Sequence, residues 1–144
     1  MGEALSATPV IDEKIVAGIG CRKGTSADTV ISVLADALAQ VGHEGFQPAM
    51  LATGRIKAEE AGIIEAADRL GIPLIIVEQA ALEASAPRTL TTSEVSIAHT
   101  GTPSLCEAAA LAAAGETAEL ATPRLVRDGV TCAIAIANTR KTKQ

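Results

Sequence analysis

Residues 18–26 combine glycines, cations and hydroxyls in the manner of an anion-binding turn. The segment reads Gly18-Ile19-Gly20-Cys21-Arg22-Lys23-Gly24-Thr25-Ser26. Glycine lets the backbone come close to a ligand, and Arg22 and Lys23 add full positive charges. The segment matches neither the dinucleotide fingerprint G-x-G-x-x-G nor the phosphate loop G-x-x-x-x-G-K-[ST], so a generic nucleotide enzyme is not favoured. A purely structural turn, in which glycine only lets a helix pack against a strand, explains the pattern about equally well.

A cation at the start of a helix opposes the macrodipole, so a lysine at position 57 needs another interaction to favour it. Lys57 is therefore the best single candidate for a ligand contact. The alternative is a solvated lysine that pairs with Glu60, one turn further along, or with Glu59. Glu60 is a candidate general base, although a glutamate in a first helical turn is more often a partner of the dipole. Cys21 is a weak candidate nucleophile, since no histidine is near it in sequence. The sequence favours a packed or ligand-facing thiol at this position.

The elements that position these residues follow from the hydrophobic pattern. An apolar strand over Ile15 to Gly20 precedes the turn, and Gly42 is a plausible end of the helix that follows. Thr25 and Asp28 have the spacing of a capping box. The apolar stripe of that helix contains Val30, Ile31, Leu34, Ala37, Leu38 and Val41. The exposed N–H groups of such a helix start would favour an anion in the turn.

The first half of the chain continues with a strand over Gln47 to Thr53, a helix over Lys57 to Leu70 and a strand over Leu74 to Val77. The order β-α-β-α-β predicts a parallel sheet. Loops that follow adjacent parallel strands meet at one edge, so Thr53 and Lys57 should lie near Arg22 and Lys23.

The second half predicts short helices over Gln79 to Ala84 and Ser93 to His99, and an alanine-rich helix over Ser104 to Ala114. Ser104 and Glu107 have capping-box spacing, and the turn from Gly101 to Ser104 could complete the same pocket. Strands over Leu120 to Leu125 and Val130 to Ala137 flank Asp128-Gly129, a strong hairpin signal.

These patterns predict one α/β domain over residues 14–138, with flexible tails at 1–13 and 139–144. We expect a three-layer α/β/α arrangement around a mixed, mostly parallel sheet of about five strands, with a C-terminal β-hairpin.

The composition limits the class of partner. The formal net charge is -5 and the aromatic content is 1%, so nucleic acid is an unfavourable partner. Cys21, Cys106 and Cys132 form neither a disulfide framework nor a zinc pattern, and we expect no metal and no cofactor. The lack of a disulfide framework fits a reducing compartment, and no apolar run approaches the length of a membrane span. We therefore expect a cytoplasmic protein without membrane contact.

Five ordered blocks resemble the CobE family, which is equivalent to the C-terminal domain of CbiG from cobalamin biosynthesis. The blocks are Gly18 to Gly24, Ala52-Thr53 with Lys57 and Glu60, Ser93 with Val95 and Gly101, Ser104 with Glu107 to Ala110, and Val130 to Ala135. They span residues 14–137 in the expected order and spacing, with Arg124 where the family tends to have lysine.

The resemblance implies a domain that acts on or binds a ring-contracted corrinoid, whose ring carries acetate and propionate carboxylates. The implied ligand-binding residues are Gly18, Gly20, Cys21, Arg22, Lys23, Gly24, Thr53, Lys57, Gly101, Ser104 and Glu107. The first hypothesis is binding of an anionic corrinoid or precorrin intermediate. The second is a hydrolase that opens a ring-A lactone with release of an aldehyde, using Lys57 and Glu60 as catalytic residues. The third is a non-catalytic module that delivers an intermediate to other enzymes of the pathway.

Overall fold

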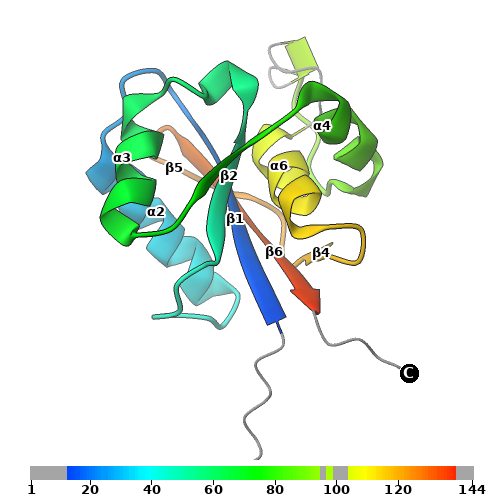
Figure 1. The fold of residues 1–144 in the computed structure, drawn as a ribbon, viewed down its shortest axis with the longest axis horizontal. Coiled ribbons are helices and arrows are strands. Elements are labelled where there is room, and N and C mark those ends of the chain that lie inside the picture. Colours follow the sequence, from blue (N-terminus) through cyan, green and yellow to red (C-terminus); the bar gives the residue numbers. More distant parts are fainter. Residues whose placement is uncertain (1–12, 95–96, 99–103, 139–144) are drawn as a thin grey trace, which may run out of the picture.

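A computed structural model describes residues 13–94, 97–98 and 104–138 of the 144-residue chain. Its strands are β1 (Glu13–Cys21), β2 (Met50–Gly54), β3 (Leu74–Val77), β4 (Glu119–Leu120), β5 (Leu125–Arg127) and β6 (Val130–Asn138). Its α-helices are α2 (Ala27–Gln40), α3 (Ala61–Leu70), α4 (Gln79–Ser85) and α6 (Leu105–Ala114), and two 3-10 turns are η2 (Arg55–Lys57) and η3 (Ala86–Arg88). Helices α2 and α3 cover one face of the sheet, and α4 and α6 cover the other (Figure 1). The expected three-layer α/β/α fold is therefore confirmed.

The sheet has six strands in the order β3-β2-β1-β6-β4, with β5 also paired to β6. The pairs β1–β2 and β2–β3 are parallel, as the β-α-β-α-β order predicts. The pairs β1–β6, β4–β6 and β5–β6 are antiparallel. The expected mixed, mostly parallel sheet with a C-terminal hairpin is confirmed, and β6 enters the centre of this sheet beside β1, antiparallel to it. Nothing in the periodicity of a hairpin shows which strand it joins.

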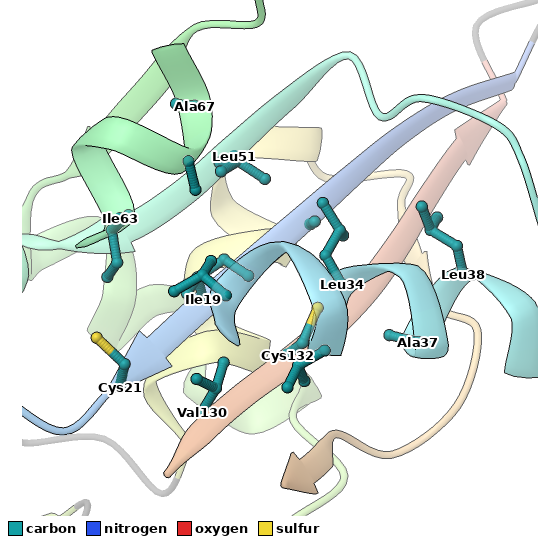
Figure 2. Packing of buried hydrophobic residues seen from close by; sticks show 14 of the residues in the cluster. Ile19, Cys21, Leu34, Ala37, Leu38, Leu51, Ile63, Ala67, Val130 and Cys132 are labelled. Carbon is teal, nitrogen blue, oxygen red and sulfur yellow. The ribbon is translucent and has the colours of Figure 1, made fainter. Parts of the chain in front are cut away.

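The two faces of the sheet are built from side chains of different size. In β1, Ile15, Ala17, Ile19 and Cys21 point into the cluster beneath α2 and α3, which large aliphatic side chains fill (Figure 2). On the other face, Val16 of β1 packs with many alanines of α6 and β6. This division follows from the period-2 alternation of a strand.

The small residues let α6 lie very close to the sheet. A Cβ atom at Gly18 would stand 1.9 Å from the carbonyl oxygen of Cys106 in α6. Ala133 and Ala135 of β6 are also fully buried on this face, beside α6. Gly18 is therefore a packing residue on the side of β1 that faces α6.

The starts of two helices differ from the sequence expectations. Ser26, not Thr25, caps α2, because the Thr25 hydroxyl donates to the Arg22 carbonyl oxygen at 2.7 Å. Lys57 closes η2, and Glu60 is the N-cap of α3, which begins only at Ala61.

Helix α6 begins as expected at Ser104, but no side-chain capping bond forms there. The helix predicted over Ser93 to His99 lies partly outside the described residues, and Gly101 lies wholly outside them. The hairpin at Asp128-Gly129 is confirmed, with φ angles of 53° and 81° that suit a type I′ turn.

Two kinds of feature are absent from the described residues. They contain no helix that is both long and apolar enough to cross a membrane. They also contain no group of three or more His, Cys, Asp or Glu residues that could hold a metal ion.

Candidate functional site

A cleft of about 340 Å³ opens where β1 ends, between the glycine-rich turn, η2 and the β5–β6 hairpin. Three cations from three separate segments line it: Arg22, Lys57 and Arg124. The other lining residues are Gly20, Cys21, Ser93, Leu105, Val126, Gly129 and Thr131. The position agrees with the general rule that ligands of open α/β sheets bind beyond the carboxyl ends of the strands.

The hairpin turn holds Arg22 at the cleft. The Arg22 N–H donates to the Gly129 carbonyl oxygen at 2.9 Å, and the Arg22 carbonyl oxygen accepts from the N–H and the hydroxyl of Thr25. A Cβ atom at Gly129 would stand 3.2 Å from Cδ of Arg22, so the arginine side chain lies against this glycine. Glycine at 129 therefore allows the left-handed turn and also leaves space for the side chain of Arg22.

Glu60 links the glycine-rich turn to the segment that carries Lys57. Its Oε2 atom accepts a hydrogen bond from the Gly24 N–H at 2.7 Å. A carboxylate that accepts from a backbone N–H makes a charge-assisted bond. The two loops that follow β1 and β2 are thus tied together beside the cleft, and this bond engages the Glu60 carboxylate.

Cys21 is 8% exposed and is one of the residues that line the cleft. Burial raises the pKa of its thiol, and the charge of Glu60 raises this pKa further. A hydrogen bond with Thr25 and the charge of Lys57 act in the opposite direction but do not reverse the rise. The thiol form is therefore favoured near neutral pH, which does not suit a nucleophile.

Arg124 reaches the cleft from the segment that precedes β5. Its backbone N–H donates to Oε2 of Glu107 at 2.9 Å, so its place depends on a carboxylate of α6. Thr131 lines the cleft from β6, and its hydroxyl donates to the Gly20 carbonyl oxygen at 3.4 Å. Leu105 and Val126 supply apolar surface, and Val126 is 57% exposed.

The charges of the cleft suit an anionic ligand. Among the described residues, no carboxylate lies within ion-pair distance of Arg22, Lys57 or Arg124, whereas Arg55, Arg69 and Arg127 each have at least one. Arginine can bind a carboxylate with two parallel hydrogen bonds, and lysine acts as a point charge. The arrangement can therefore bind several carboxylates around one apolar body.

The structure brings four of the residues expected from the sequence into this cleft, and these are Gly20, Cys21, Arg22 and Lys57. Lys23 and Gly24 lie on the exposed turn next to it. Gly18, Thr53, Ser104 and Glu107 do not line it. Thr53 is fully buried and its hydroxyl donates to the Ile19 carbonyl oxygen at 2.7 Å. Ser104 and Glu107 are fully buried at the start of α6.

Sequence reasoning did not assign Arg124, Leu105, Val126, Gly129 or Thr131 to the site. Arg124 carried a usable signal, since it is a cation near the end of the predicted strand over Leu120 to Leu125. The other residues have types that are ordinary in a core or a turn. The pairing of β6 with β1 brings Gly129 and Thr131 to the end of β1.

Comparisons with known proteins identify the family of the chain and agree with its fold. Residues 15–135 match the family model described as cobalamin synthesis G C-terminus. The chain is 36% identical over 121 residues to Protein CobE of Sinorhizobium sp., with 84% of this chain and 79% of that protein covered.

Two solved structures are similar. The crystal structure of CobE, described as a protein from the cobalamin (vitamin B12) biosynthetic pathway, has a TM-score of 0.82 at 33% identity and covers 88% of this chain and 95% of that one. The crystal structure of the cobalamin biosynthesis protein chiG from Agrobacterium tumefaciens has a TM-score of 0.69 at 50% identity. The match covers 85% of this chain and 98% of that one. By its family match, its sequence identity to a relative and its fold, the chain belongs to the CobE and CbiG C-terminal family of cobalamin biosynthesis proteins.

Proposed function

We propose that this protein binds an anionic corrinoid or precorrin intermediate in the cleft at the end of β1. The observation that carries the proposal is the convergence of Arg22, Lys57 and Arg124 on one cleft from segments far apart in sequence. Membership of a family of cobalamin biosynthesis proteins supplies the class of ligand.

The charges and the apolar surface of the cleft both suit this ligand. Corrinoid intermediates carry acetate and propionate side chains, and the three cations can each pair with one of these carboxylates. The apolar edge of the ring can rest on Leu105 and Val126, which lie in the same cleft. The cleft is small compared with a whole macrocycle, so we expect it to hold one edge of the ring and its side chains.

Binding is favoured over hydrolytic opening of a ring-A lactone. Hydrolysis needs a general base within hydrogen-bond reach of an attacking water. Among the described residues that line the cleft, none is Asp, Glu or His. Glu60 already accepts from the Gly24 N–H, and the raised pKa of Cys21 does not favour a thiolate. We therefore propose that Lys57 binds a carboxylate and that Glu60 positions the loop.

The test uses two corrin probes that differ in charge. Cobyrinic acid has free carboxylate side chains, and in cobinamide these are amides. We expect a spectral shift and calorimetric heat with cobyrinic acid, and binding at least tenfold weaker with cobinamide. Equal affinity for both probes, or no binding of cobyrinic acid, would contradict the proposal.

Three variants locate the binding. The affinity for cobyrinic acid should fall about tenfold, or about 1.4 kcal/mol of binding free energy, in each of the variants Arg22→Ala, Lys57→Ala and Arg124→Ala. Lys14→Ala is the matched control, because it removes the same charge near the opposite end of β1. Release of an aldehyde from a lactone-bearing corrinoid by the wild-type protein would instead support the hydrolase.

A further inference from the structure

Glu107 is a completely buried carboxylate that collects hydrogen bonds from two other segments of the chain. It lies in the first turn of α6 and is 0% exposed. Its Oε1 atom accepts from the N–H groups of Leu90 and Thr91, both at 2.9 Å. Its Oε2 atom accepts from the Thr91 hydroxyl at 2.8 Å and from the Arg124 N–H at 2.9 Å. One carboxylate thus receives four donors.

This bonding differs from that of a capping box. Glu107 stands three residues after Ser104, where a glutamate often reaches back to the N-cap of its own helix. Here its carboxylate is turned toward the segment after η3 and the segment before β5. The four donors match the acceptor capacity of an ionised carboxylate, which has no proton to give.

Stability alone is a weak reason for a charge at this position. Burial of an ionised carboxylate has a large desolvation cost, which its hydrogen bonds must first offset. What the carboxylate adds is geometry, because its two oxygen atoms fix the directions of three backbone N–H groups at once.

Both segments that Glu107 holds contribute to one wall of the cleft. Arg124 lines the cleft with its side chain while its N–H is bound to Glu107. Ser93, which also lines the cleft, follows Thr91 by two residues. This wall is therefore anchored on a carboxylate that does not itself line the cleft.

We propose that Glu107 is a positioning residue for the anion cleft. Glu107 holds the backbone of Arg124 so that the Arg124 guanidinium faces the same ligand as Arg22 and Lys57. The inference rests on the proposed binding function for its consequence in affinity. Its structural part, the anchoring of the 90–91 and 124 backbones by Glu107, can be measured without any ligand.

The first measurement is amide hydrogen exchange in the full chain. In Glu107→Gln, an NH₂ group replaces one acceptor oxygen, so at least one backbone N–H loses its partner. The N–H groups of Leu90, Thr91 and Arg124 should exchange at least tenfold faster than in the wild type. The N–H groups of Ala17 and Ile134 in the central strands should be unchanged. Equal acceleration in the central strands would show a global loss of stability and would overturn the proposal.

The second measurement is a double-mutant cycle with cobyrinic acid, made below the unfolding temperature of every variant. Glu107→Gln should weaken binding about as much as Arg124→Ala, roughly tenfold, and the double variant should be no weaker than Arg124→Ala alone. Additive losses, or unchanged affinity in Glu107→Gln, would show that Glu107 does not act through Arg124. If the wild type binds no corrin probe, the proposed function fails, and hydrogen exchange still decides whether Glu107 anchors this wall.

A milder pair of variants keeps the test decisive if Glu107→Gln does not fold. Thr91→Val removes one donor to Glu107 and leaves three, whereas Thr89→Val removes a similar hydroxyl that donates to the Ala86 carbonyl oxygen at 2.8 Å. Thr91→Val should accelerate exchange at Arg124 and weaken cobyrinic acid about threefold, and Thr89→Val should do neither. Equal effects of the two variants would overturn the proposal.

Discussion

Gly18 leaves no space for a side chain, and this fixes how closely α6 approaches the sheet. Gly18→Ala would place a Cβ atom 1.9 Å from the Cys106 carbonyl oxygen and 2.9 Å from the Ala110 nitrogen. Both are helix backbone atoms, so α6 would have to move as a unit. We expect the free energy of unfolding to fall by about 3 kcal/mol or more, measured by urea denaturation.

Gly24→Ala is the control for this substitution. Gly24 has φ 81° and no heavy atom within 4 Å of the added Cβ atom, so only backbone strain opposes the alanine. Its cost should be about 1 kcal/mol. If both variants lose the same stability, the close approach of α6 is not the cause.

The buried thiols predict a loss of stability in alkaline solution. Burial raises the pKa of Cys106 to about 11, and it raises the pKa of Cys132 well above its ordinary value. Since the folded-state pKa lies above the unfolded-state value, this stabilising contribution is complete below the unfolded pKa of about 9 and is lost as the pH rises toward 11. We expect the melting temperature to fall between pH 8.5 and 10.5.

The double variant Cys106→Ala/Cys132→Ala separates the thiols from other groups that titrate in this range. Each thiol contributes a slope of up to about 1.4 kcal/mol per pH unit above its unfolded pKa. The variant should therefore have a shallower pH dependence than the wild type. An unchanged slope would assign the alkaline loss to lysines.

Individual site residues were predictable where their chemistry was visible in the sequence. Arg22 and Lys57 stand out because they are cations in loops that follow apolar strands. The bonding of Glu107 was not predictable, because its donors come from residues 90, 91 and 124, and capping explained its spacing equally well. Sequence spacing reports contacts within an element and carries no signal for such distant partners.

At the scale of elements, the bond between Glu60 and the Gly24 N–H joins two loops at the cleft. Glu60→Ala removes the acceptor and should weaken cobyrinic acid severalfold, with a loss of stability of about 1 kcal/mol. Glu60→Gln keeps an amide oxygen as acceptor and should bind nearly as well as the wild type. Titration calorimetry and thermal unfolding measure the two effects.

This pair of variants also distinguishes positioning from catalysis. A general base at position 60 would lose its function in glutamine as well as in alanine. Aldehyde release from a lactone-bearing corrinoid that is abolished in Glu60→Gln would contradict the positioning role.

The order of elements in the first half followed from periodicity and turn residues. The strand Leu74–Val77 has the predicted bounds, and Gly71 ends α3 in the left-handed conformation, with φ 72°. The 3-10 turn before α3 was not predicted, because Lys57 to Glu60 has the composition of an ordinary helical first turn. The placement of β6 was not predictable either, since long-range pairing leaves no local signal.

At the scale of the whole molecule, a positive cleft lies on a chain whose net charge is -5. The attraction between the cleft and a polycarboxylate should therefore be local and sensitive to salt. The Debye screening length shortens from about 14 Å to about 4 Å when the ionic strength rises from about 50 to about 500 mM. We expect the affinity for cobyrinic acid to fall at least tenfold over this range. Cobinamide should show little change, and a salt dependence shared by both probes would point to a contribution other than carboxylate pairing.

The pairing of β1 with β6 also has a mechanical consequence. Glu13 lies opposite Asn138 in the antiparallel register, so the start of β1 and the end of β6 are side by side, at the opposite end of these strands from the cleft (Figure 1). Force applied at these two positions would pull the central strands apart from their shared end, and it would load one pair of ladder hydrogen bonds at a time. The domain should therefore unzip at low force, and the rupture should travel along the sheet until it reaches Cys21 and Val130 at the cleft.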